Sequence, residues 1–192
     1  MSQKLYGHFL EKLVERVKKI KVGPAEDPAN YMGPVINKSA MKSILDYIEV
    51  GRREGQVLTG GKSAAGDGYF IEPTVIADVD RRARVFREEI FGPVLAVTKA
   101  RNFDDALAMA NDSEFGLTGA VYTKNKKKIA RAAKEFHVGN LYMNRKCTGA
   151  LVGGHPFGGF NMSGTDSKAG GKDYLLLFLQ GKAVSEKIRA RK

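Results

Sequence analysis

Between Phe9 and Ile48, apolar residues recur every three or four positions, which is the spacing of an amphipathic helix. The pattern predicts two helices, one ending at Gly23-Pro24 and one ending at Gly51. Each helix must bury its apolar stripe against another surface. The stripes consist of Phe9, Leu10, Leu13, Val14, Val17 and Ile20 in the first helix and of Ala40, Met41, Ile44, Leu45 and Ile48 in the second.

The apolar pattern shortens after Gln56 and then alternates between strands and helices. The continuous apolar run 94–97 predicts a strand covered on both faces. Asn102 and Asn125 can cap two later helices, and Asp105 resembles a capping-box partner of Asn102. The further predicted strands are 120–122 and 138–143, and the helical residues expected to face inward are Phe103, Ala106, Leu107, Ala110, Ile129, Ala132, Ala133 and Phe136.

This strand-helix-strand order predicts parallel strands, because a parallel connection needs a crossover long enough to hold a helix. We therefore expect an α/β fold, in which a mostly parallel sheet is layered between helices. The chain has no internal repeat or low-complexity linker, so we expect one domain over 1–173, followed by a tail over 174–192. The apolar run 175–179 in this tail predicts a short helix, and 182–186 predicts an exposed strand that docks on another surface.

The composition indicates a folded chain in a reducing compartment. Hydrophobic residues make up 43% of the 192 positions, enough to fill a core. No stretch reaches the roughly 18 apolar residues of a membrane-spanning helix. The single cysteine, Cys147, excludes an intrachain disulfide and a zinc-finger framework. We expect a soluble, cytoplasmic protein that binds neither a metal nor a membrane.

A net charge of +11 would suit a nucleic-acid partner, since clustered Lys and Arg displace counterions from phosphates. The distribution weakens that interpretation, because the largest cluster follows one face of a helix whose other face is apolar, as solvated helix faces do. Neither basic cluster has the interleaved aromatic residues of a single-strand binder, so we expect no nucleic-acid partner. The clusters are Lys124, Lys126, Lys127, Lys128, Arg131 and Lys134, and Arg81, Arg82, Arg84 and Arg87.

Two loops, 87–93 and 144–160, combine glycine, proline and aromatic residues at the ends of predicted strands. Open α/β sheets bind their ligands at such strand ends. In the first loop, Glu89 can accept two hydrogen bonds from a sugar diol, and Phe91 offers an apolar face to a planar ring. The structural alternative, equally good on spacing alone, is an ion pair between Glu89 and a nearby arginine, with Phe91 in the core.

These motifs resemble two signatures of the aldehyde dehydrogenase superfamily. The family's Glu-Glu-Ile-Phe-Gly-Pro-Val stands at 88–94, and its Pro-Phe-Gly-Gly-Phe-x-x-Ser-Gly stands at 156–164. The correspondence runs from about Leu5 to Ala183, and 148–153 and 163–171 are similar to the 1-pyrroline-5-carboxylate dehydrogenase branch in particular. The resemblance implies the C-terminal portion of a catalytic domain whose start is missing.

The resemblance also implies an NAD-dependent oxidation of glutamate semialdehyde to glutamate. It makes Glu89 the ligand of the nicotinamide ribose hydroxyls and Phe91 a wall beside the nicotinamide. Gly149 and Ala150 match the loop whose backbone NH groups hold the α-carboxylate of the substrate, and consecutive NH groups do form a positive nest. Phe157 would line the aldehyde pocket.

The family's nucleophile and general base have no counterpart in this chain. Its mechanism needs a cysteine thiolate and a glutamate-activated water, and the resemblance places both, with the nucleotide-binding domain, before the first helix. Cys147 follows Arg145 and Lys146, which can activate a thiol, but it matches the substrate-anchor loop, where relatives need no thiol. We therefore expect no catalytic residue here and no turnover by the chain alone.

The tail at 174–192 is similar to the family's C-terminal strand, which pairs with a hairpin of another subunit. The resemblance thus implies a homo-oligomer, because exposed strand edges promote association. It also leaves a second class of function open, an assembly or interaction module without catalysis.

Overall fold

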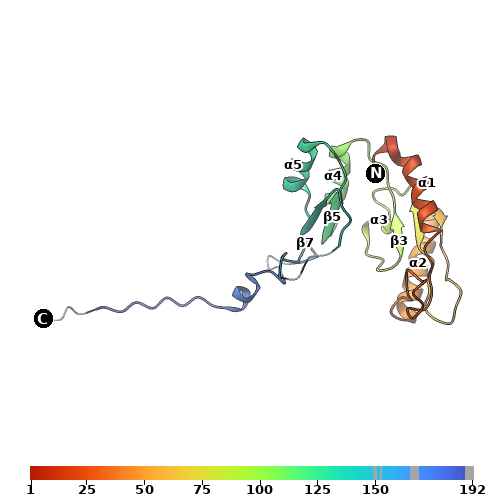
Figure 1. Cartoon of the computed structure of the whole chain (residues 1–192). Helices are drawn as coiled ribbons and strands as arrows, with labels where there is room; N and C mark the ends of the chain where they lie inside the picture. The colour runs from red at the N-terminus through yellow and green to blue at the C-terminus, as the bar shows by residue number, and fades with distance from the viewer. Residues whose placement is uncertain (149–150, 152, 165–168, 189–192) are drawn as a thin grey trace. The chain divides into compact units, whose positions relative to one another are not determined.

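A computed structural model gives the structure of the chain. The residues that it describes are 1–148, 151, 153–164 and 169–188. Contacts divide the chain into two compact units, Met1–Ser113 and Glu114–Lys192, and each is described by itself (Figure 1). The expected boundary at residue 173 stays a prediction.

The first unit is built around a three-stranded sheet of order β1-β2-β3. The central strand β2 runs antiparallel to β1 and parallel to β3, with Thr74 paired to Val94. A short 3-10 helix precedes α1. The elements in chain order are η1 Gln3–Leu5, α1 Tyr6–Val17, α2 Lys38–Glu54, β1 Gln56–Thr59, β2 Thr74–Ala77, α3 Arg84–Arg87, β3 Val94–Ala96 and α4 Phe103–Asn111.

Helices α1 and α2 cover opposite faces of this sheet, because neighbouring residues of β2 point to opposite faces. Val75 packs with the buried Tyr6 of α1. Ile76, which is fully buried, packs instead against Tyr47 and Val50 of α2. Most of each predicted apolar stripe therefore has its partner surface, although Phe9 is exposed. The expected α/β class is confirmed, but this sheet is mixed rather than mostly parallel.

The side chain of Tyr6 fastens α1 to the sheet. Its hydroxyl donates to the carbonyl of Val97 at 3.0 Å and accepts from the backbone NH of Asp78 at 2.7 Å. Burial raises the pKa of Tyr6, and the Lys99 ammonium lies 4.7 Å from its ring centroid. A helix that contacts the sheet mainly through aliphatic groups thus gains two directional hydrogen bonds.

Several sequence predictions for this unit are corrected. Helix α1 ends at Val17 rather than at Gly23, and Gly51 lies buried inside α2. Asn102 caps α4 as predicted, accepting from the backbone NH of Asp105 at 2.9 Å, but Met109 is buried where Ala110 was expected. Leu95 of β3 is 46% exposed, so the expectation of a strand covered on both faces is wrong for this unit.

The second unit contains two small sheets. Strands β5 and β6 are parallel and joined through α5, as the strand-helix-strand pattern predicted. Strands β4 and β7 are antiparallel. Asn125 caps α5 by accepting from the backbone NH groups of Lys127 and Lys128, and Ala132 is the buried residue of that helix. The elements are β4 Phe115–Gly116, β5 Thr118–Val121, α5 Lys126–Glu135, β6 Asn140–Met143, β7 Phe160–Asn161 and η2 Tyr174–Phe178.

The tail begins with the expected short helix, η2, which is of the 3-10 type. Within residues 179–188 no strand is formed, so the predicted tail strand is not seen there. Leu175, Phe178 and Leu179 are each about 70% exposed, at 73%, 71% and 69%. None of the described helices is both long enough and apolar enough to cross a membrane.

Candidate functional site

The segment from Glu88 to Pro93 alternates between anchored and outward-facing residues. Glu88 is held by polar contacts, and Ile90 packs against two clusters of buried residues, one that contains Ile76 and Val85 and one that contains Ile44 and Ile48. A Cβ added to Gly92 would lie 2.6 Å from Cδ1 of the buried Ile44. The carbonyl of Pro93 accepts from the backbone NH of Thr74 at 2.8 Å, which ties the segment to the start of β2.

Glu88 is the polar anchor of this segment. Its carboxylate accepts two hydrogen bonds from the Arg84 guanidinium, at 2.8 and 2.9 Å, and one from the Tyr47 hydroxyl at 2.7 Å. These partners, Arg84 first, lower the pKa of Glu88 to about 2. The guanidinium also lies 5.5 Å from the centroid of the Tyr47 ring. Helix α3, which carries Arg84, is itself held at Val85, whose backbone NH donates to the Glu54 carboxylate at 3.1 Å.

The residues between these anchors, Glu89 and Phe91, face solvent. Phe91 is 85% exposed and adopts a left-handed backbone with φ of 56°. A non-glycine residue in that region is uncommon and costs on the order of 1 kcal/mol, which indicates that its surroundings impose the conformation. Among the described residues, the Glu89 carboxylate has no hydrogen-bond or ion-pair partner. The nearby arginines Arg84 and Arg87 pair instead with Glu88 and Asp112.

The structural alternative for this loop is therefore wrong for the described part of the chain, where Glu89 is not in an ion pair and Phe91 is not in the core. An unengaged carboxylate beside an exposed aromatic ring can accept two hydrogen bonds from a diol and cover a planar group. Sequence reasoning missed Glu88, Arg84 and Tyr47 as anchors. The spacing of Arg84 and Glu88, four residues apart, is the only local signal that could have suggested their pairing.

Acidification should release this anchor. A lowered pKa means that ionised Glu88 stabilises the folded loop above its ordinary pKa of 4.5, and that this contribution is lost as the pH falls toward 2. Carboxyl-carbon NMR should report a titration near pH 2 for Glu88. In an Arg84→Met variant, which removes the largest cause, the midpoint should move toward 4.5, and an unmoved midpoint would contradict the assigned cause.

The second candidate loop lies in the second unit. The Arg145 guanidinium donates to the Thr148 hydroxyl at 2.9 Å and lies 5.1 Å from the Tyr142 ring centroid. Phe157 is 37% exposed, and its backbone exchanges two hydrogen bonds with Ala169, at 2.7 and 2.9 Å. Cys147 is an exposed free thiol. Hydrogen bonds thus hold the described part of this loop near its start, between Arg145 and Thr148, and near its end, between Phe157 and Ala169.

Gly149 and Ala150, predicted as substrate ligands, lie outside the described residues. The two candidate loops belong to different units, so their expected position at one cleft stays a prediction. Within the described ranges, no group of three or more His, Cys, Asp or Glu side chains could hold a metal ion.

Comparisons with known proteins give the family. The sequence profile of the aldehyde dehydrogenase family matches residues 1–184. The chain is 58% identical over 182 residues to the 1-pyrroline-5-carboxylate dehydrogenase of Anoxybacillus flavithermus, covering 95% of this chain and 35% of that protein. It is 57% identical over 186 residues to the same enzyme of Bacillus subtilis, covering 97% of this chain and 36% of that one.

Comparison with solved structures gives the same family as the sequence comparisons. The 1-pyrroline-5-carboxylate dehydrogenase from Thermus with bound NAD superposes with a TM-score of 0.93 at 50% identity, covering 97% of this chain and 36% of that chain. A betaine aldehyde dehydrogenase from Staphylococcus aureus in complex with NAD+ gives 0.88 at 35% identity, covering 94% and 37%. The chain spans about a third of the length of these relatives. The resemblance drawn from its two signature motifs is confirmed: the chain belongs to the aldehyde dehydrogenase family.

Proposed function

We propose that these residues form part of an NAD-dependent enzyme that oxidises glutamate semialdehyde, the open form of 1-pyrroline-5-carboxylate, to glutamate. The identity to several bacterial 1-pyrroline-5-carboxylate dehydrogenases supports the substrate. The observation that carries the proposal is the loop at Glu89 and Phe91, which offers an unengaged carboxylate next to an exposed ring.

The acceptor and the apolar ring that this loop presents fit the nicotinamide end of NAD. Glu89 would accept hydrogen bonds from the two ribose hydroxyls, and Phe91 would lie beside the ring and exclude water from it. When bound, NAD accepts the hydride that leaves the substrate carbon. A charge-assisted hydrogen bond is worth about 1.5–3 kcal/mol, so Glu89 orients the cofactor and does not hold it alone.

The substrate end is assigned by the family resemblance. Gly149 and Ala150 would donate backbone NH groups to the α-carboxylate, and Phe157 would line the aldehyde pocket. The Arg145–Thr148 hydrogen bond supports this assignment, because it fixes the residue that precedes Gly149. The only thiol of the chain, Cys147, precedes Thr148, and we assign it no catalytic role.

A chimera tests the proposal. The matching third of the Bacillus subtilis relative is replaced by this chain, and NADH formation from glutamate semialdehyde is followed by absorbance. We expect activity in the chimera, none in the isolated chain, and about a tenfold rise in the KM for NAD in the Glu89→Gln chimera, the effect of losing about 1.5 kcal/mol.

The matched control is Glu26→Gln, which changes a carboxylate of the same unit that takes no part in the candidate loop. Its KM for NAD should not change. NADH formation by the isolated chain that disappears on Glu89→Ala would contradict the proposal that this chain supplies binding groups but no catalytic residue. A folded chimera without any activity would contradict the substrate assignment.

A second candidate function is assembly through the tail at 174–192. The exposed Leu175, Phe178 and Leu179 support it, since a run of apolar side chains at a chain end usually docks on another surface. Light scattering of the purified chain should detect dimers or larger species, whereas a strictly monomeric profile would contradict this role. A cytoplasmic location is part of the proposal, and the single cysteine is consistent with it.

A further inference from the structure

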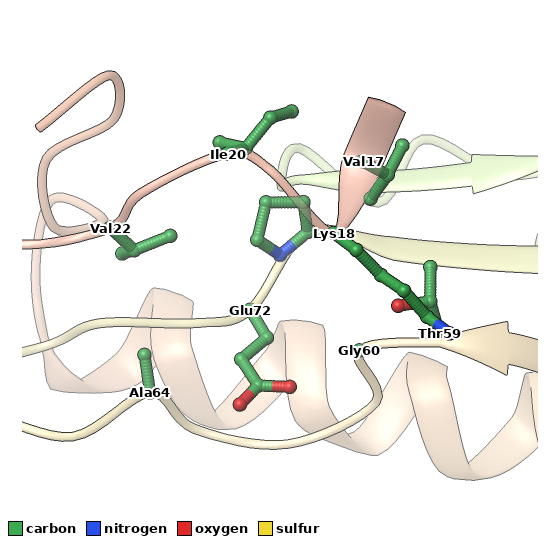
Figure 2. Close-up of a pocket in the computed structure, with 9 residues that line it drawn as sticks. Val17, Lys18, Ile20, Val22, Thr59, Gly60, Ala64 and Glu72 are labelled. Atoms are coloured by element: carbon green, nitrogen blue, oxygen red, sulfur yellow. The ribbon is translucent and has the colours of Figure 1, made fainter. Parts of the chain in front are cut away.

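A cleft of about 300 Å³ lies in the first unit, where the end of α1 meets the turn that follows β1 (Figure 2). This volume is at the lower end of the range of small-molecule sites, roughly 300–1,000 Å³. Its lining combines apolar side chains with polar and charged groups, and such polar groups can fix the orientation of a bound molecule. The apolar residues are Val17, Ile20, Val22, Ala64 and Pro73, and the polar ones are Lys18, Thr59 and Glu72.

Backbone contacts hold the walls of this cleft. On one side, the backbone NH of Gly23 donates to the carbonyl of Met32 at 3.1 Å, next to the bridge between Val22 and Met32. On the other side, Glu72 donates its backbone NH to Lys62 at 3.0 Å. The pairing of β1 with β2 shifts register just before Thr59, and irregular strand ends of this kind often stand beside binding sites. The cleft is therefore pre-formed.

The two charged side chains of the lining approach from different walls. In Figure 2 the Lys18 side chain extends from the end of α1 toward Thr59, and the Glu72 side chain points between Ala64 and Gly60. Among the described residues, Lys18 has no ion-pair partner for its ammonium, and it does not pair with Glu72. The following residue, Lys19, is by contrast paired with Glu15.

Glu72 keeps binding capacity of its own. Within the described ranges its one ion-pair partner is Lys62, at 3.7 Å, and the side chain of Lys62 is 72% exposed. Such a long, solvent-exposed pair contributes little, on the order of 0–1 kcal/mol. A ligand ammonium can therefore replace or join Lys62 at this carboxylate at small cost. The cleft thus offers one group that can bind an anion and one that can bind a cation, with apolar side chains in the same lining.

We propose that this cleft binds the zwitterion of an α-amino acid with a small apolar side chain. The ligand carboxylate meets the Lys18 ammonium and the Thr59 hydroxyl, the ligand ammonium meets the Glu72 carboxylate, and the aliphatic side chain lies against Val17, Ile20 and Pro73. A simple anion would leave Glu72 without a role, and a simple cation would leave Lys18 without one. The proposal concerns a site separate from Glu89 and does not depend on the proposed enzymatic function.

The test compares three probes on the purified chain: L-valine, isovalerate, which lacks the ammonium, and isobutylamine, which lacks the carboxylate. Backbone NMR titrations should show saturable shifts at residues 17–22, 59–64 and 72–73 with L-valine. The two probes that lack one charge should bind at least about fivefold more weakly, the effect of losing one ionic contact of about 1 kcal/mol.

Substitutions in the lining of the cleft give a second, independent test of L-valine binding. Lys18→Met and Glu72→Gln should each weaken L-valine binding about fivefold, whereas Lys19→Met, the matched control at the neighbouring paired lysine, should leave it unchanged. Equal binding of L-valine and isovalerate, or no saturable shifts at these residues, would overturn the proposal. The probe comparison needs no substitution, so it decides the matter even if a variant does not fold.

Discussion

Replacing Gly139 with alanine should lower the free energy of unfolding of the second unit by about 3 kcal/mol or more. A Cβ at this position would overlap the carbonyl oxygen of Gly158, and it would lie 2.5 Å from the carbonyl carbon of Gly158 and 2.8 Å from Cα of Gly159. All three atoms belong to the backbone, so no side chain can rotate away. Gly139 also donates its backbone NH to Gly116 at 2.9 Å, which prevents the strand from shifting in compensation.

Urea denaturation followed by circular dichroism measures this effect. The matched control is Gly181→Ala in the same unit, where an added Cβ meets nothing within 4 Å and stability should change by less than about 0.5 kcal/mol. Equal stability of Gly139→Ala and the wild-type chain would mean that the Gly158–Gly159 segment does not pack on the start of β6. That contact links the signature motif at 156–164 to the sheet, so its loss should also disturb Phe157.

The sequence predicts the local part of the fold well, because the deciding interactions lie within a few residues. Asn102 and Asn125 cap their helices through backbone NH groups two or three positions away. Tertiary contacts decide the rest. Gly51 was expected to end α2, yet the helix continues through it. The glycine is explained by packing instead, because the position faces Ile76 and a larger residue would not fit there. The run 94–97 has the composition of a strand covered on both faces, but nothing in the first unit covers Leu95.

The candidate site is predictable only in part. Glu88 and Glu89 are adjacent and chemically identical, and only the four-residue spacing from Arg84 favours Glu88 as the ion-pair partner. Tyr47, which also donates to Glu88, stands 41 positions earlier, so no local pattern shows its contribution. The cleft at Lys18 and Glu72 escapes sequence analysis for the same reason, since its two charges come from distant segments that only the folded unit brings to one place.

Gly92→Ala should be the most damaging alanine substitution in the Glu89 loop, with a loss of about 3 kcal/mol of stability in the first unit. The added Cβ would lie 2.6, 2.7 and 2.9 Å from three side-chain atoms of Ile44, Cδ1, Cγ1 and Cγ2. Ile44 is only 1% exposed and packs with Ile48 and Ile71, so it has little room to move. The loop must then move outward, and it carries Glu89 and Phe91 with it.

A double-mutant cycle isolates this contact. Ile44→Val removes Cδ1, so Gly92→Ala should cost at least about 1 kcal/mol less in that background than in the wild-type chain. Gly33→Ala is the matched control, since its Cβ would meet only the Cβ of Ala25, at 4.0 Å. In the chimera, Gly92→Ala should raise the KM for NAD as Glu89→Gln does, because the displaced loop moves the Glu89 carboxylate with it. An unchanged KM together with the full loss of stability would separate the two effects and show that the Glu89 loop can take up the shift without moving its ligand groups.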